Sequence, residues 1–362
     1  MLATSVRLGA ALALVGTTVS CSAPSSKELS HATPASVPMS DSGADVPTRT
    51  PGAEEAMALV GSPAVESRGV GRRTGGGARR DQEPSPGVLT AAAWDDARHW
   101  SQYTKFLHRA RENAWNVWGL EVDRSSIHQV RDANQNEPVR APRRALDMGF
   151  LVDATGSMGD EMAFLQSELK DIVRRVRAVE PDLDIRVSVV FYRDRGDAFV
   201  TLSHPFTRNV DEAVAFMSTT SADGGGDFPE DMNAGLEAMM RQRWSRDRVP
   251  QMLFLVADAP PQRYAGADYT YHDAIRDAAA KGIAIYPVAA SGVDKPTEFL
   301  LRAMAVMTGG KYLFLTDDSG VGESHEEPDI TGYTVEKLND LMVREIRSFV
   351  EARMRSTVAE AR

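Results

Sequence analysis

The stretch Met148-Gly-Phe-Leu-Val-Asp153-Ala-Thr155-Gly-Ser157 decides how this chain folds. Its first part is a short apolar run without polar alternation, which predicts a strand covered on both faces, as in a parallel sheet between two helical layers. The run ends in Asp153, and small and hydroxyl residues follow at once. An amphipathic pattern then begins at Met162. The stretch therefore predicts a strand, a tight polar turn and a helix.

The same alternation of strands and helices continues along the chain. Apolar runs at 185–191, 252–257, 283–288 and 312–315 predict strands, 199–202 predicts an edge strand, and helices are expected at 162–176, 210–217, 229–241, 271–281, 298–308 and 335–353. Such alternation implies right-handed crossovers between parallel strands. We therefore expect an α/β domain over residues 145–355, with a doubly wound, mostly parallel sheet and helices on both faces. Residues 356–362 are expected to form a tail.

The overall composition is that of a soluble protein with an acidic balance. Of the 362 residues, 42% are hydrophobic and 25% are charged, and the formal net charge is −10. Nucleic-acid-binding proteins need a basic face to offset phosphate charge, so the composition argues against a nucleic-acid partner. A negative balance is compatible with a cation site.

The N-terminus has the pattern of an export signal. Arg7 gives a positive start, residues 8–15 form an apolar run too short to span a bilayer, and Cys21 follows small residues. Residues 1–21 resemble a bacterial lipoprotein signal, which implies cleavage before Cys21, lipidation of that cysteine and anchoring to the cell envelope, with no other membrane contact. Thr18 stands where the lipoprotein pattern prefers Leu. A secretory signal and a buried N-terminal helix therefore stay open as alternatives.

Two segments precede the predicted domain. Residues 22–89 are rich in Ser, Pro, Ala and Gly, cannot bury much apolar surface and are expected to form a disordered linker. Residues 90–144 are expected to hold a helical segment, from Thr90 to about Val122, and a polar connector. Four of the five tryptophans fall in this segment, so it must pack against something. It resembles a Trp-Asp-Asp segment found ahead of similar domains in bacterial surface proteins. We expect an extension packed on the main domain; a partner-binding aromatic face is the alternative.

Two predicted strands end in aspartate, at Asp153 and at Asp258. In open α/β sheets ligands bind beyond the carboxyl ends of the strands, so both carboxylates are expected at one site. They would repel each other unless a cation lay between them or one of them held a proton. Thr155 and Ser157 alternate after Asp153, so a tight loop could direct both hydroxyls to the same centre.

A third loop, Asp223-Gly-Gly-Gly-Asp227-Phe-Pro-Glu-Asp231, could approach this centre closely because its three glycines lack side chains. All candidate donors are oxygen atoms. Oxygen donors select a hard cation, namely Mg²⁺, Mn²⁺ or Ca²⁺, and Mg²⁺ keeps several of its waters when it binds. Such a site leaves a coordination position for a partner's oxygen.

The motif Asp153-x-Thr155-x-Ser157 resembles the metal-ion-dependent adhesion site of von Willebrand factor type A domains, usually written Asp-x-Ser-x-Ser. Asp258 matches the late aspartate of that family, and Asp227 falls where the family usually has threonine. The resemblance implies a metal held by Asp153, Thr155, Ser157, Asp227 and Asp258, with an acidic residue of an unknown partner protein completing its shell. The wording of the three motifs is similar to a branch that includes bacterial surface proteins and the A domain attached to alpha-kinases.

An enzyme is the main alternative to this binding module. Ser157 could act as a hydrolase nucleophile, with Asp258 and either His272 or His325 completing a triad. Against it, the carboxylate of Asp153 would lie where an oxyanion needs hydrogen-bond donors. Asp153 could instead accept a phosphoryl group, although such enzymes want a second carboxylate where Thr155 stands. A scaffold without metal is a third possibility.

Other polar residues have structural interpretations. The aspartates and hydroxyls of the motif could cap helices. The remaining acidic residues of the two loops, namely Asp160, Glu161, Glu230 and Asp231, are expected to stabilise helix N-termini. The tripeptide Arg195-Gly-Asp197 has the form of an adhesion motif, and we interpret it as a turn after the second strand.

Overall fold

The computed structural model describes residues 84–126, 144–246 and 249–360, and the side chains as far as residue 354. These residues belong to one compact unit. The predicted signal segment with Cys21, nearly all of the predicted linker and most of the connector lie outside the described residues. Within the described part of the chain, no helix has the length and apolar character needed to cross a membrane.

One eight-stranded sheet forms the centre of the domain, in the order β4-β3-β2-β5-β6-β7-β1-β8. The five strands β2, β3, β5, β6 and β7 run parallel, while β4 and β1 are antiparallel to their neighbours. The strands are β1 (Thr90–Trp94), β2 (Ala145–Asp153), β3 (Asp184–Tyr192), β4 (Thr201–Thr207), β5 (Gln251–Ala257), β6 (Ile283–Ala289), β7 (Tyr312–Leu315) and β8 (Glu336–Lys337). The mostly parallel, doubly wound sheet predicted from the sequence is confirmed.

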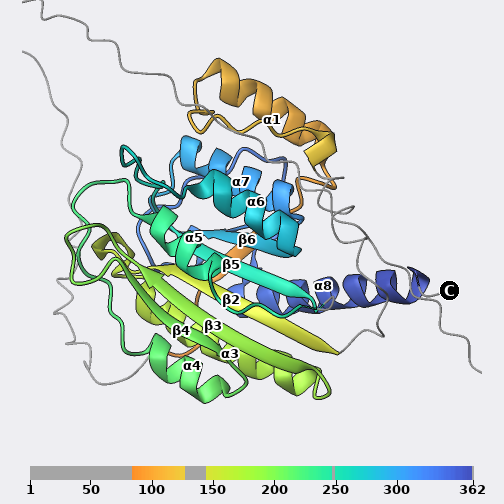
Figure 1. Cartoon of the computed structure of the whole chain (residues 1–362). Helices are drawn as coiled ribbons and strands as arrows, with labels where there is room; N and C mark the ends of the chain where they lie inside the picture. Colours follow the sequence, from red (N-terminus) through yellow and green to blue (C-terminus); the bar gives the residue numbers. More distant parts are fainter. Residues whose placement is uncertain (1–83, 127–143, 247–248, 361–362) are drawn as a thin grey trace, which may run out of the picture. The chain divides into compact units, whose positions relative to one another are not determined.

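Helices cover both faces of this sheet (Figure 1). One face packs against α3 (Met162–Val179), α4 (Val210–Met217) and α8 (Leu338–Glu360). The other packs against α5 (Met232–Met240), α6 (Tyr271–Lys281) and α7 (Lys295–Thr308), with α1 (Trp100–Glu112) outside α7. Strands β2 and β5 are buried along their whole length, because apolar side chains meet a helical layer on each side.

Close packing of α5 on the sheet depends on a missing side chain. A Cβ at Gly235 would lie 2.8 Å from the ring of Tyr192 and 2.9 Å from the side chain of Leu151. Asp231 caps this helix, since its Oδ1 accepts a hydrogen bond from the backbone N–H of Ala234 at 3.0 Å. The start of α5 is thereby fixed next to the carboxyl ends of β2 and β3.

The segment expected to be helical from Thr90 onward needs one correction. Residues 90–94 form the strand β1, and the helix α1 begins only at Trp100. Alanine-rich sequence favours a helix, but backbone pairing with β7 and β8 provides hydrogen bonds on both sides of this segment and overrides that preference. The edge strand expected at 199–202 is also displaced, since β4 covers residues 201–207.

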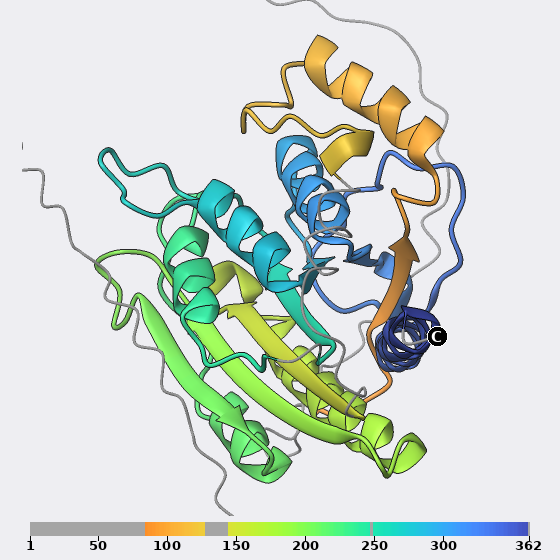
Figure 2. The same ribbon diagram turned by 45° about the vertical axis from the view of Figure 1, so that its right-hand side comes forward.

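The segment ahead of the main domain is bound to it by buried polar groups. Glu168 on α3 accepts hydrogen bonds at its Oε1 from the backbone N–H groups of Gly87, Val88 and Leu89, at 2.6, 2.8 and 3.2 Å. The indole N–H of Trp118 donates to the carbonyl of Pro296 at 2.8 Å. Figure 2 shows β1 lying between the α7 side of the domain and the end of α8. The expected extension packed on the domain is thus observed.

Candidate functional site

Asp153 is the last residue of β2, and its carboxylate is fully buried. The N–H and the hydroxyl of Thr155 both donate to its Oδ1, at 2.9 and 2.6 Å. Its other oxygen, Oδ2, is buried and has no hydrogen-bond partner. The hydroxyl oxygens of Thr155 and the exposed Ser157 lie 3.2 Å apart, so the turn does bring the two hydroxyls together.

Asp258 lies just beyond the carboxyl end of the neighbouring strand β5. It is 3% exposed, and its Oδ1 is buried without a partner. Burial and the negative charge of Asp153 raise the pKa of Asp258 to about 7, while a hydrogen bond from Ser157 opposes the rise. Burial likewise raises the pKa of Asp153 to about 6, against the bonds from Thr155 and an interaction with the hydroxyl of Tyr192. The charge of Asp153 thus acts on Asp258, and burial disfavours a negative charge on either aspartate.

The glycine loop packs against the turn that follows Asp153. The N–H of Gly156 donates to the carbonyl of Gly224 at 3.1 Å. Gly225 adopts a φ of +73°, and a Cβ there would meet Oε1 of Glu230 at 2.7 Å and Cβ of Thr155 at 3.3 Å. Only glycine suits this conformation and this close approach. Oδ2 of Asp197 accepts a hydrogen bond from the N–H of Gly225 at 2.9 Å. The Arg195-Gly-Asp197 turn therefore has a structural role in holding this loop.

Asp227 differs from Asp153 and Asp258 in its burial. It is exposed, and its Oδ2 accepts a hydrogen bond from Nε2 of Gln262 at 2.9 Å. Glu230, three residues later, is instead buried, with 3% exposure, and its Oε2 has no partner. Burial and the neighbouring carboxylates, first Asp153 and then Asp194, raise the pKa of Glu230 to about 9. From the sequence, Glu230 is expected only at a helix N-terminus; its place in the glycine loop is the signal that indicates a site residue.

Glu161, also expected from the sequence at a helix N-terminus, is buried. Its Oε1 accepts the N–H of Ser291 at 3.2 Å and contacts Nε2 of His325 at 3.0 Å. The other ring nitrogen of His325 lies 2.7 Å from Oδ1 of Asp317. This arrangement occupies both ring nitrogens of His325, and His272 lies exposed on α6. Neither histidine is therefore placed as the general base that the hydrolase alternative requires for Ser157.

The oxygen atoms of this site are of the kind that bind a divalent cation. The site contains two buried carboxylate oxygens without hydrogen-bond partners, one on Asp153 and one on Asp258, and the two adjacent hydroxyls of Thr155 and Ser157. Burying a carboxylate without a partner costs free energy unless a cation or a proton compensates its charge. Among the described residues, no three His, Cys, Asp or Glu side chains gather closely enough to hold a metal by themselves. A cation here would therefore depend on hydroxyl and water ligands, which suits Mg²⁺.

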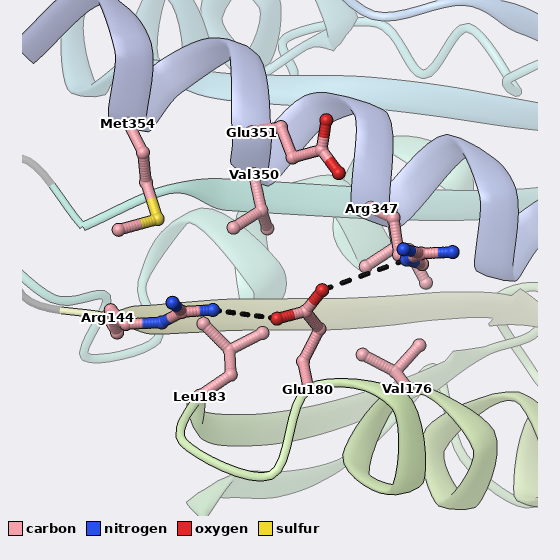
Figure 3. A pocket seen from close by; sticks show the side chains of 9 residues that line it. Arg144, Val176, Glu180, Leu183, Arg347, Val350, Glu351 and Met354 are labelled. Atoms are coloured by element: carbon pink, nitrogen blue, oxygen red, sulfur yellow. Dashed lines mark hydrogen bonds and ion pairs between the residues drawn. The ribbon is translucent and has the colours of Figure 1, made fainter.

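A groove of about 400 Å³ lies at the other end of the sheet, between α3 and α8. Figure 3 shows Glu180 between two arginines, with Arg144 at 2.7 Å and Arg347 at 3.7 Å, and with Val350 of α8 on the opposite side of the groove. Arg144 directly precedes β2, whereas Asp153 ends that strand. The groove is thus remote from the paired aspartates, and its arginines are already engaged by Glu180.

The fold and the site together define the class of protein. It is a doubly wound α/β domain whose polar site lies in loops at the carboxyl ends of its central strands. Residues 147–326 match the von Willebrand factor type A domain family, and the chain therefore carries a von Willebrand factor type A domain. Domains of this family are generally interaction modules and often bind a divalent metal ion.

Two curated proteins match parts of this chain. A putative ariadne-like RING finger protein of Acanthamoeba polyphaga mimivirus is 29% identical over 215 residues, which are 54% of this chain and 20% of that protein. The alpha-protein kinase vwkA of Dictyostelium discoideum is 29% identical over 133 residues, 35% of this chain and 21% of the kinase. The chain thus spans about a fifth of the length of these curated relatives.

Solved structures with a similar fold are more distant in sequence. The pilus adhesin SpaC of Lactobacillus rhamnosus GG, in its open conformation, is 10% identical with a TM-score of 0.39, covering 59% of this chain and 30% of the adhesin. The conserved hypothetical protein BatB of Bacteroides thetaiotaomicron is 12% identical with a TM-score of 0.37, covering 57% of this chain and 99% of that structure. Similarities of this size carry no argument about function.

Proposed function

We propose that this domain binds one divalent cation, Mg²⁺ or the related Mn²⁺ or Ca²⁺, and uses it to bind a partner protein. The observation that carries the proposal is the pair of buried carboxylate oxygens without hydrogen-bond partners, on Asp153 and Asp258. A cation between them would compensate the burial that raises both pKa values and the charge of Asp153 that further raises the pKa of Asp258.

In this proposal Ser157 and Thr155 offer hydroxyl oxygens to the cation. Asp153 and Asp258 complete its shell or hold its waters. Ser157 is exposed, whereas Thr155 is buried, so the cation would be reached by a partner from the side of Ser157. The cation supplies positive charge and an exchangeable position, which an acidic side chain of a partner can fill. The chain's own residues only hold and orient it, so this is a binding role and not a catalytic one.

The direct test is isothermal titration of the purified domain with Mg²⁺ and with Mn²⁺. We expect saturable binding by the wild type and its loss in Asp153→Ala. Asp211→Ala, an exposed aspartate in the first turn of α4, serves as the control and should bind normally. Absence of binding by the wild type would contradict the proposal. Ester or phosphatase turnover that Ser157→Ala or Asp153→Ala abolishes would favour the enzyme alternative.

We also propose that the domain is displayed on a cell envelope by a lipid on Cys21. This residue lies outside the described part of the chain, so the proposal rests on the resemblance of residues 1–21 to a lipoprotein signal. Full-length protein expressed in a bacterial host should fractionate with membranes, and Cys21→Ser should release it. Partner capture from such a membrane fraction should depend on divalent metal and be lost with EDTA. Equal membrane association of both proteins would refute the anchor.

A further inference from the structure

The backbone of Glu230 connects the two loops of the site. Its backbone N–H donates to the carbonyl of Pro260 at 2.9 Å, and its own carbonyl accepts the N–H of Gln262 at 2.7 Å. These bonds join the glycine loop to the segment that follows Asp258. Glu230 is therefore held in place by its backbone and does not depend on its side chain for its position.

The side chain of Glu230 lies against the centre of the site. Its Oε1 and the Cβ of Thr155 both face the position that a Cβ of Gly225 would fill. Its Oε2 is buried and has no hydrogen-bond partner. A buried carboxylate without a partner costs free energy, and such a group persists where function requires it.

We propose that Glu230 is the third carboxylate of the cation site and that it acts on the cation across a bridging water. The inference deepens the proposed function and rests on it. A bridging water is part of this proposal because, among the described residues, Glu230 does not gather with two other acidic side chains or His into a group that could hold a metal. Mg²⁺ in proteins keeps several waters, and a carboxylate that holds such a water fixes its orientation. Glu230 takes the role that the sequence suggested for Asp227, which points to Gln262 on the exposed rim.

The two acidic residues of the same loop can be compared directly. Glu230→Gln removes the charge and keeps the shape, and Asp227→Asn does the same three residues away. Isothermal titration with Mn²⁺ should show affinity lowered about 10- to 100-fold by Glu230→Gln, the usual range for groups that hold metal ligands in place. Asp227→Asn should change the affinity by less than about threefold, because an exposed charge is screened.

A stability measurement distinguishes this role from a structural one. Glu230→Gln should not lower the unfolding temperature of the metal-free protein, because Oε2 has no hydrogen bond that the variant would lose, while the affinity for Mn²⁺ falls. If the wild type binds no Mn²⁺, the proposed function itself fails. If the wild type binds and Glu230→Gln binds equally well, or if Asp227→Asn is the weaker binder, the assignment to Glu230 is overturned.

Discussion

The guanidinium group of Arg302 on α7 forms two parallel hydrogen bonds with the carboxylate of Asp96, at 2.7 and 3.0 Å, and both residues are buried. A second carboxylate, Glu298, lies 2.9 Å from the same arginine. The ring of Phe106 from α1 packs on the guanidinium plane, 3.7 Å away. This cluster joins the segment ahead of the domain to its helical layer.

We expect Asp96→Ala to lower the free energy of unfolding by about 3–5 kcal/mol, because it leaves part of a buried arginine charge without its partner. The measurement is urea unfolding followed by circular dichroism. Asp95→Ala is the control; its carboxylate only accepts the backbone N–H of Arg98 at 2.9 Å, so about 1 kcal/mol is expected. Equal losses in the two variants would show that the cluster contributes no special stability.

Gly225→Ala should abolish or strongly weaken metal binding without unfolding the domain. The new Cβ would press on Glu230 and Thr155, and alanine at a φ of +73° costs on the order of 1 kcal/mol. Gly226→Ala is the matched control, because no atom lies within 4 Å of a Cβ there. Titration with Mn²⁺ and a thermal melt of each variant check both parts. Unchanged affinity in Gly225→Ala would place the cation elsewhere.

The acidic site predicts a particular pH dependence of the metal-free protein. Folding raises the pKa values of Asp153, Asp258 and Glu230, to about 6, 7 and 9. The folded state then binds more protons than the unfolded state, so stability falls as pH rises from about 4 to about 9. Thermal unfolding in EDTA should therefore occur at a lower temperature near pH 9 than near pH 5. Mg²⁺ should reduce this decline, and an equal decline with and without Mg²⁺ would count against a cation at these carboxylates.

His325 predicts a pH effect that is independent of metal. Burial lowers its pKa, but hydrogen bonds to Glu161 and Asp317 outweigh this and leave the pKa raised. Its stabilisation is thus complete below the ordinary pKa of about 6.5 and is lost as pH rises through the higher folded value. His325→Gln should destabilise the protein by about 1.5–3 kcal/mol near pH 5.5 and by less near pH 9. The exposed His272→Gln is the control, and a pH-independent difference would contradict the prediction.

Much of the fold follows from local patterns in the sequence. The helices at 210–217 and 271–281 and the strand at 312–315 have the predicted bounds, since apolar periodicity and capping residues such as Asn209 and Thr270 are local signals. Strand β1 could not be predicted, because its partners β7 and β8 lie far along the chain. The order of the strands likewise depends on pairings between distant segments.

The candidate site was predictable in part for the same reason. The motif residues are close in sequence, and alternate residues of a tight turn can point to the same side. The sequence therefore predicts that the side chains of Asp153, Thr155 and Ser157 lie close together. The glycine loop contains several acidic residues, and the sequence does not show which one turns inward. That choice depends on the backbone pairing of Glu230 with Pro260 and Gln262, which only the folded chain reveals.

The position of β1 has a mechanical consequence. The strand pairs antiparallel with β7 on one side and with β8 on the other, and Glu168 holds the residues just before it. A pulling force applied to the chain ahead of Thr90 in the direction of this strand would load its hydrogen bonds with β7 and β8 in shear, together rather than one by one. Pulling with optical tweezers from this end should therefore meet a higher rupture force in the wild type than in Glu168→Ala. A domain built in this way can carry load through the same strand by which its chain enters.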